Sequence, residues 1–150
     1  MEGKDIIERV KQNISAEMEE FGRQFESVLH TRLPLADSVI RYFLSRSGKQ
    51  LRPIVTILAA KLIGQVNSST IYGAVSLELL HNATLMHDDV IDQSDQRRGV
   101  DTINKIWDNR VAVLMGDFFL SKCLYCSHAT GSLAISRILA DMVTELVEGE

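Results

Sequence analysis

Apolar residues recur at helical spacing along almost the whole chain, and no stretch shows the strict alternation that is typical of a half-buried strand. The pattern predicts a first helix over residues 4–29, with one continuous apolar face. This face consists of Ile6, Val10, Ile14, Met18, Phe21, Phe25 and Val28. The sequence therefore predicts an all-α fold.

Glycine and proline mark the ends of the next two helices. We expect a second helix over residues 34–45 with Gly48 as its C-terminal glycine, and a third over residues 51–63 that ends at Gly64. Pro53 falls in the first turn of the third helix, where its missing N–H costs nothing. The chain therefore turns a corner between these two helices.

The fourth predicted helix is apolar nearly all round. It runs to about Ile91 with Ser68 or Ser69 as its N-cap, and a helix without a polar face lies at the centre of a bundle. The charged residues 92–108 predict a loop, and another apolar helix follows over residues 109–127.

A last helix begins near Ser132, after a break at Thr130 and Gly131, and keeps its helical spacing to the end of the printed sequence. Because no capping sequence follows, we expect the chain to be cut within a helix rather than finished.

Three carboxylates gather at the end of the central helix. Asp88 and Asp92 are four residues apart and face the same way on a helix, with Asp89 beside them. Like charges at a helix C-terminus repel one another and oppose the helix dipole, so folding alone does not favour them. Mg²⁺ reverses that repulsion, and it prefers one or two carboxylates together with substrate phosphates. The cluster therefore indicates a site for a metal–diphosphate complex.

Positive charge follows in the loop. Arg97 and Arg98 precede Gly99, and paired guanidiniums next to a glycine can bind phosphate oxygens bidentately while the backbone comes close. The alternative is a solvated loop with local Asp–Arg pairs of little energetic value. The apolar helix that leads into the cluster favours the binding site.

Three further residues allow two interpretations each. Lys49 and Arg52 lie at the corner between two helices, where they could bind an anion or merely complement the dipole of the preceding helix. His81 lies two turns before Asp88 on the same face, and it could be a ligand or a satisfied core histidine.

The composition agrees with a compact domain or part of one. Of 150 residues, 45% are hydrophobic and 24% are charged, and the net charge of -4 argues against a general nucleic-acid-binding protein. No signal peptide is visible, and no apolar run reaches the ~20 residues that span a bilayer, so we expect a cytoplasmic protein without a transmembrane segment. Cys123 and Cys126 are too few for a disulfide framework and are expected to pack in the core.

Four segments in order resemble the trans-isoprenyl diphosphate (polyprenyl) synthases. GKQLRP at 48–53 resembles their G-K-x-x-R-P segment, and HDDVID at 87–92 resembles their first aspartate-rich motif, D-D-x-x-D. RRG at 97–99 matches the R-R-G that follows it, and VLMGDF at 113–118 is similar to their G-D-[YF] helix. The resemblance, which is strongest to octaprenyl and other medium-to-long-chain synthases, implies the N-terminal half of a helical bundle of the isoprenoid synthase type.

The resemblance also implies a reaction and a role for each site residue. The parent protein would be a Mg²⁺-dependent prenyltransferase of isoprenoid biosynthesis, a homodimer that condenses isopentenyl diphosphate head to tail with an allylic prenyl diphosphate. Asp88, Asp89 and Asp92 would hold Mg²⁺ on the allylic diphosphate, and Arg97 would contact that diphosphate. The residues that would bind the diphosphate of isopentenyl diphosphate are Lys49, Arg52, His81 and Arg98.

The chain departs from the family's pattern in two ways. Gln50 stands where a basic residue is common, which weakens the cationic corner. The family's second aspartate-rich motif and its lysine-threonine segment are not in the sequence, so we expect the chain to be inactive alone. Ala83 and Thr84, just before the aspartates, are small where short-chain synthases tend to carry an aromatic residue. The resemblance thus implies a product of medium or long chain, octaprenyl-like or geranylgeranyl-like.

Three other classes were weighed against this one. A non-catalytic small subunit of a heteromeric prenyl synthase would be expected to have damaged aspartates, and here they are intact. A metal-dependent phosphohydrolase could use His87 and Asp88, but His30 and His128 have no neighbouring Asp to complete such a site. A terpene synthase would share the D-D-x-x-D motif without the GKQLRP and RRG segments.

Overall fold

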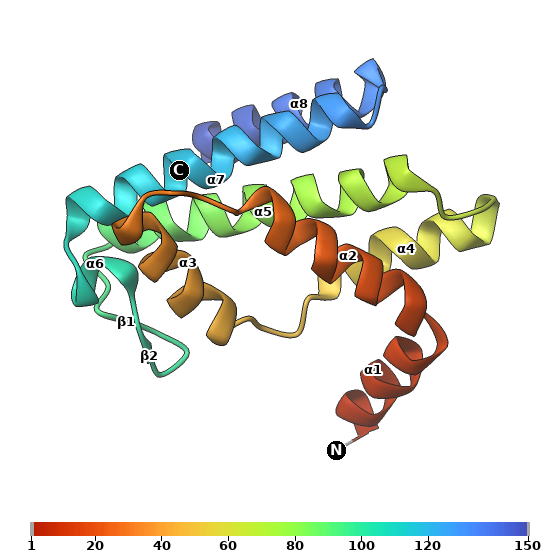
Figure 1. Ribbon diagram of the computed structural model, residues 1–150, viewed down its shortest axis with the longest axis horizontal. Helices are drawn as coiled ribbons and strands as arrows, with labels where there is room; N and C mark the ends of the chain where they lie inside the picture. Colours follow the sequence, from red (N-terminus) through yellow and green to blue (C-terminus); the bar gives the residue numbers. More distant parts are fainter. Residues whose placement is uncertain (1, 150) are drawn as a thin grey trace.

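The computed structural model describes residues 2–149, and within them the chain forms helices joined by short connections and one two-stranded ribbon (Figure 1). The helices are α1 (Glu2–Asn13), α2 (Ser15–Val28), α3 (Pro34–Ser45), α4 (Leu51–Ile63), α5 (Ser68–Ile91), α6 (Ile103–Ile106), α7 (Asn109–Ala129) and α8 (Leu133–Gly149). The strands are β1 (Gln96–Arg97) and β2 (Val100–Asp101). The predicted all-α fold is confirmed.

Helix α5 lies at the centre of the bundle, as its sequence predicts. It runs beside α7, while α2 and α4 cover it from another side and α8 packs on α7 (Figure 1). Its apolar side chains are buried around most of its circumference, and they include Ile71, Ala74, Val75, Leu79, Leu80 and Ala83. The end of α5, the ribbon, α6 and the start of α7 gather at one end of the molecule (Figure 1). The polar end of a buried helix therefore reaches the surface there.

The N-terminus of α5 begins one residue earlier than predicted. Asn67 is its N-cap, and the Asn67 side-chain oxygen accepts a hydrogen bond of 3.0 Å from the backbone N–H of Thr70. The Thr70 hydroxyl in turn accepts one of 3.3 Å from the Asn67 N–H, which completes a capping box. The prediction of Ser68 or Ser69 as the cap is wrong, because Asn67 holds the extended backbone that a cap requires.

The prediction of one helix over residues 4–29 is also wrong, because the chain bends at Ile14. The backbone of Ile14 departs from helical geometry (φ −120°, ψ 28°), and α1 turns away from α2 (Figure 1). The Ile14 side chain is 1% exposed and packs with Ile54 and Ile57 of α4, whereas Phe21 on α2 belongs to the main core. The two halves of one apolar face thus have different partners, and the bend at Ile14 allows each half to pack against its own.

The corner between α3 and α4 differs from the prediction in one detail. Helix α3 ends at Ser45 with Arg46 as its C-cap, and Gly48 does not adopt a left-handed backbone. The left-handed residue of this connection is Gln50 (φ 55°), the N-cap of α4. Gly48 is therefore not a C-terminal glycine, whereas Gly131 (φ 70°) occupies that position at the predicted break after α7.

An aromatic contact ties three helices into the main core. The rings of Phe25 on α2 and Phe43 on α3 are 6.4 Å apart, and Phe43 meets Phe119 on α7 edge to face at 4.9 Å. Cys123 and Cys126 are buried in the same core, as predicted, and burial raises their thiol pKa values to about 11 and about 12. Among residues 2–149, none of the helices has the length and apolar character needed to cross a bilayer.

Replacing Phe119 by Ala should lower the free energy of unfolding by about 3–5 kcal/mol, because the removed ring is fully buried and leaves a cavity. Leu124→Ala, on the same helix but 64% exposed, should change it by less than about 0.5 kcal/mol. Urea unfolding followed by circular dichroism measures both values. Equal losses in the two variants would contradict the central position of Phe119.

Candidate functional site

A cavity of about 670 Å³ opens between the α3–α4 corner, the last half of α5 and the β1–β2 ribbon. Five cationic side chains line it, namely Arg46, Lys49, Arg52, Arg97 and Arg98. The other ionisable side chains of its lining are Tyr42, Glu78, His81, Asp89 and Asp101. The cavity thus brings together all the predicted diphosphate-binding residues from segments that are far apart in the sequence, and its lining is richer in cations than in carboxylates.

The ribbon that carries the two arginines closes through a tight turn. Arg97 pairs with Val100 across the ribbon, and the two residues between them, Arg98 and Gly99, both have positive φ values of 53° and 78°. Two such residues in a two-residue hairpin loop form a type I′ turn, which favours glycine at the second place. Residues 92–108 were predicted as a loop, but they contain this ribbon and α6, and Gly99 has a structural reason for its place.

Asp89 and Arg97 form a bidentate ion pair across the end of α5. The Arg97 Nη2 atom donates to Asp89 Oδ1 at 2.7 Å, and Arg97 Nε donates to Oδ1 at 3.1 Å and to Oδ2 at 3.4 Å. The Asp89 residue is 8% exposed. Such fork-to-fork pairs fix the plane of the guanidinium as well as its position. The pair therefore aims Arg97 along the cavity wall, and the Asp89 carboxylate already has a cationic partner. The metal-binding role of Asp89 remains a prediction.

Asp88 and Asp92, here called the acidic rim, flank Asp89 at the end of α5 and do not line the cavity. Within residues 2–149, neither carboxylate makes an ion pair within 4 Å, Asp88 is half-buried and Asp92 is exposed. Among those same residues, no three His, Cys, Asp or Glu side chains form a metal-ligand group. Two carboxylates are nevertheless what Mg²⁺ takes from a protein when phosphates and water complete its coordination. The residues present therefore fit a Mg²⁺–diphosphate ligand rather than a metal held by protein alone.

The backbone that carries the rim ends in a Schellman motif. The Ser94 N–H donates to the Asp89 carbonyl at 2.9 Å, and the Gln93 N–H donates to the Val90 carbonyl at 3.2 Å. Gln93 adopts the left-handed conformation (φ 54°) that this motif requires and that usually favours glycine. These bonds satisfy the carbonyls at the end of α5, so they fix the direction in which the chain leaves the aspartate cluster.

His81 faces the cations of the cavity. Partial burial, together with the nearby charges of Arg52, Arg97 and Arg98, lowers the pKa of its imidazole to about 4. The ring is therefore neutral at pH 7 and could donate one N–H to an anion. Its position in the cavity excludes the alternative of a plain core histidine away from the site.

Glu78 lies one turn before His81 and was given no role by the sequence. Burial raises the pKa of its carboxyl, while the charge of Arg52 and a bond from Asn82 act in the opposite direction. Its Oε2 atom is buried without a hydrogen-bond partner among residues 2–149. A lone acidic residue in an apolar helix, one turn from a histidine, was the available signal.

Other supporting contacts had no signal in the sequence. The Tyr42 hydroxyl donates to the Asp101 carbonyl at 2.7 Å and joins α3 to the ribbon. The buried Thr102 hydroxyl donates to the Ser94 carbonyl at 2.8 Å, which closes the segment between α5 and α6. The ribbon is thus held from both sides.

The two predicted chain-length residues occupy different surroundings. At ~100° per residue, Thr84 lies about 40° from Asp88 around α5, whereas Ala83 lies about 140° away. Thr84 is half-buried on that face, and Ala83 is 2% exposed inside the main core. Neither residue lines the cavity, so their role in product length remains a prediction.

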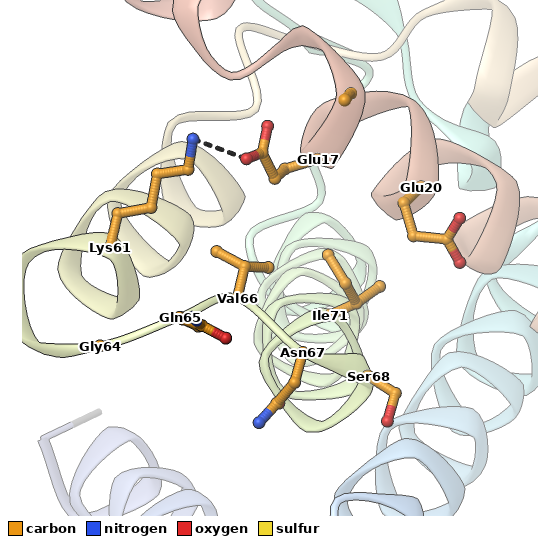
Figure 2. Close-up of a pocket in the computed structure, with 10 residues that line it drawn as sticks. Glu17, Glu20, Lys61, Gly64, Gln65, Val66, Asn67, Ser68 and Ile71 are labelled. Carbon is orange, nitrogen blue, oxygen red and sulfur yellow. Dashed lines mark ion pairs between the residues drawn. The ribbon is translucent and has the colours of Figure 1, made fainter.

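A second hollow lies near the other end of α5, between α2, α4 and the start of α5 (Figure 2). The one ion pair drawn there joins Lys61 Nζ to Glu17 Oε1 at 2.6 Å, and the hydrogen bond from Lys61 lowers the pKa of Glu17. Some 20 residues of helix, about 30 Å, separate this hollow from the aspartates. Glu17 and Lys61 already pair with each other, and Glu20 pairs with Arg23. The candidate site is therefore the cationic cavity.

The family follows from comparison with known proteins. The sequence model of the family described as Polyprenyl synthetase matches residues 34–150. The chain belongs to this polyprenyl synthetase family. This confirms the predicted resemblance, and each predicted motif lies within the matched range.

Relatives of this polyprenyl synthetase chain agree in sequence and in structure. Octaprenyl diphosphate synthases of Haemophilus influenzae and Escherichia coli are 34% and 31% identical to it, each over 96% of the chain. The crystal structure of a Caulobacter crescentus polyprenyl synthase complexed with calcium and isoprenyl diphosphate matches 95% of the chain with a TM-score of 0.89 and 31% identity. The chain spans 44% to 45% of the length of these relatives.

The His81 imidazole should titrate near pH 4 in this chain, well below its ordinary 6.5. As the pH falls from 6.5 to 4, the unfolded chain binds a proton there before the folded chain does, so folding stability should decrease in that window. NMR titration of the ring protons measures the pKa directly. The decrease in stability should be smaller in His81→Asn, and a midpoint near 6.5 would rule out the cationic surroundings described here.

Proposed function

We propose that this chain is the N-terminal part of a trans-prenyltransferase that condenses isopentenyl diphosphate with an allylic prenyl diphosphate. The observation that carries the proposal is the cavity that Lys49, Arg52, His81, Arg97 and Arg98 line together. Asp88 and Asp92 flank Asp89 of that lining at the same end of α5. The names of the relatives support the reaction class, because they are octaprenyl, nonaprenyl and heptaprenyl diphosphate synthases.

The acidic rim of Asp88 and Asp92 and the α3–α4 corner bind different diphosphates. Asp88 and Asp92 hold Mg²⁺ on the allylic diphosphate, and Arg97 binds its oxygens in the orientation that Asp89 imposes. Bound Mg²⁺ supplies charge neutralisation for the departing diphosphate. The calcium and isoprenyl diphosphate in the Caulobacter crescentus relative support a divalent cation together with such a ligand.

The other cations receive isopentenyl diphosphate. Lys49 and Arg52 project from the α3–α4 corner, and Arg98 projects from the ribbon, so the second diphosphate lies between separate elements. His81 is neutral when the cavity is empty, and it contributes an N–H donor rather than a fixed charge. Gln50, the left-handed N-cap of α4, lines the same corner and adds no charge to it.

Three finer statements accompany the proposal. A medium or long product fits the small Thr84 beside the rim and the octaprenyl names of the relatives. A homodimer fits the exposed apolar side chains on the outer surfaces of α7 and α8, among them Leu124, Tyr125 and Leu133. The third statement is the cytoplasmic location that the sequence analysis expects.

The intact polypeptide encoded by the gene that carries this sequence should elongate an allylic primer with labelled isopentenyl diphosphate and Mg²⁺. Asp88→Ala should lower turnover by about 10²-fold or more, because a metal ligand at the departing diphosphate is lost. Asp141→Ala, at an exposed carboxylate on α8, is the matched control and should leave turnover unchanged. Product analysis by chain length checks the reaction class. A folded polypeptide that yields no elongated product would refute it, and product that appears only with a second subunit would favour the non-catalytic alternative.

The chain of 150 residues should itself bind inorganic pyrophosphate in the presence of Mg²⁺, and yet form no prenyl product. Arg52→Ala and Arg97→Ala should each weaken that binding about tenfold or more, since a charge-assisted hydrogen bond contributes about 1.5–3 kcal/mol. Calorimetric titration measures the dissociation constants. Arg137→Ala, at an exposed arginine on α8, is the control, and equal affinities in all variants would contradict the assignment of the cavity.

A further inference from the structure

His87 lies on the face of α5 that turns away from the cavity, where it packs on α7. Asp89, two residues later, lines the cavity. At ~100° per residue, the His87 side chain points about 200° away from that of Asp89 around the helix. Its Nε2 atom is 3.2 Å from the Val113 carbonyl oxygen and 3.3 Å from Asp117 Oδ1. The residue is half-buried and directly precedes Asp88, so it is the contact between α5 and α7 that is nearest to the acidic rim along the chain.

Gly116 provides the surface on which the imidazole lies. A Cβ atom at this position would be 2.4 Å from His87 Nε2 and 2.5 Å from His87 Cδ2, distances that real side chains do not allow. Gly116 is itself buried, and its backbone is ordinary helix without a positive φ. The glycine is therefore required by the histidine ring and not by the backbone.

The two neighbours of Nε2 determine the form of the ring. The Val113 carbonyl oxygen can only accept a hydrogen bond, so Nε2 carries the proton and donates to it, and Asp117 Oδ1 lies beside the same nitrogen. One side chain thus engages the backbone of α7 and a carboxylate one turn later on the same helix. Together with the close fit on Gly116, these contacts fix both the distance between the helices and the rotation of the last turn of α5.

We propose that His87 is a positioning residue which sets the direction of the Asp88 and Asp92 carboxylates. It does so from its seat on Gly116, through its hydrogen bond to Val113 and its proximity to Asp117. This inference rests on the proposed function. A helix with its side chains has a radius of about 5–6 Å, so a rotation of about 20° in the last turn displaces a carboxylate by about 2 Å. Displacements of about 1 Å in a reacting geometry can cost about 10²-fold in rate. The His87 contact therefore controls a metal site to which it contributes no ligand.

The position of the His87 contact explains why it affects Asp88 and Asp92 rather than the cations of the α3–α4 corner. Asp88 and Asp92 have no ion-pair partner of their own among residues 2–149, so only the helix that carries them determines where they point. Lys49 and Arg52 belong to the α3–α4 corner and do not depend on the rotation of α5. Loss of the contact should thus affect Mg²⁺–diphosphate binding more than the binding of isopentenyl diphosphate.

The test uses the intact polypeptide with three informative variants. His87→Leu removes the donor and keeps apolar bulk, Gly116→Ala displaces the ring, and His87→Gln returns an N–H at a similar reach. Calorimetry gives the dissociation constant of Mg²⁺ in the presence of saturating inorganic pyrophosphate, and steady-state kinetics give the KM for isopentenyl diphosphate. We expect the Mg²⁺ dissociation constant to rise about tenfold or more in His87→Leu and Gly116→Ala, with KM within about twofold, and to recover in His87→Gln.

Asp117 supplies a second route if the buried variants do not fold, because its side chain is 60% exposed. Asp117→Leu removes one acceptor and should raise the Mg²⁺ dissociation constant about threefold to tenfold, whereas Asp141→Leu on α8 should not change it. An unchanged Mg²⁺ dissociation constant in folded His87→Leu or Asp117→Leu overturns the inference. An equal rise in the Mg²⁺ dissociation constant and in the KM for isopentenyl diphosphate also overturns the inference. If the unaltered polypeptide makes no prenyl product, the proposed function fails instead, and the binding data still decide the role of His87.

Discussion

The ion pair between Asp89 and Arg97 is the interaction on which the candidate site depends. Asp89 ends a helix that is buried along most of its length, and its carboxylate is 8% exposed, so it requires a partner there. Arg97 satisfies it from a strand that begins only five residues after α5 ends. The pair folds the ribbon back against the helix and brings Arg98 to the same cavity. The position of the ribbon, and with it the place of Arg98 in the cavity, therefore depends on one buried charge.

The cavity divides its charges between elements that are fixed in different ways. The ribbon is held by Asp89, by the Tyr42 hydroxyl and by Thr102, so Arg97 enters the wall with little freedom. The α3–α4 corner is an irregular connection, and the cations it carries are exposed. A rigid cation suits a ligand whose orientation determines the reaction, and mobile cations suit a ligand that must enter and leave.

The sequence predicts the helices well where apolar residues dominate and poorly where packing partners change. Helices α5 and α7 were predictable because their sequences are apolar on nearly every side; α5 is buried at the centre, whereas α7 leaves Leu124 and Tyr125 exposed. The bend at Ile14 could not be predicted, because a continuous apolar face does not reveal that its two halves contact different neighbours. The motifs predicted which residues gather in the cavity. They could not predict the pairing of Asp89 with Arg97, which depends on a ribbon of only two pairs, or the role of Gly116, which depends on a ring from another helix.

The turn at Arg98 and Gly99 makes the length of the segment between α5 and α6 as important as its composition. Successive residues of a strand face opposite sides, so inserting or deleting one residue before β1 would carry Arg97 to the outer face and leave Asp89 buried alone. The two-residue turn cannot absorb such a change, because both of its residues already hold left-handed backbones. Variation in this segment is therefore limited to substitutions. A deletion there would abolish the cavity even if every charged residue were kept.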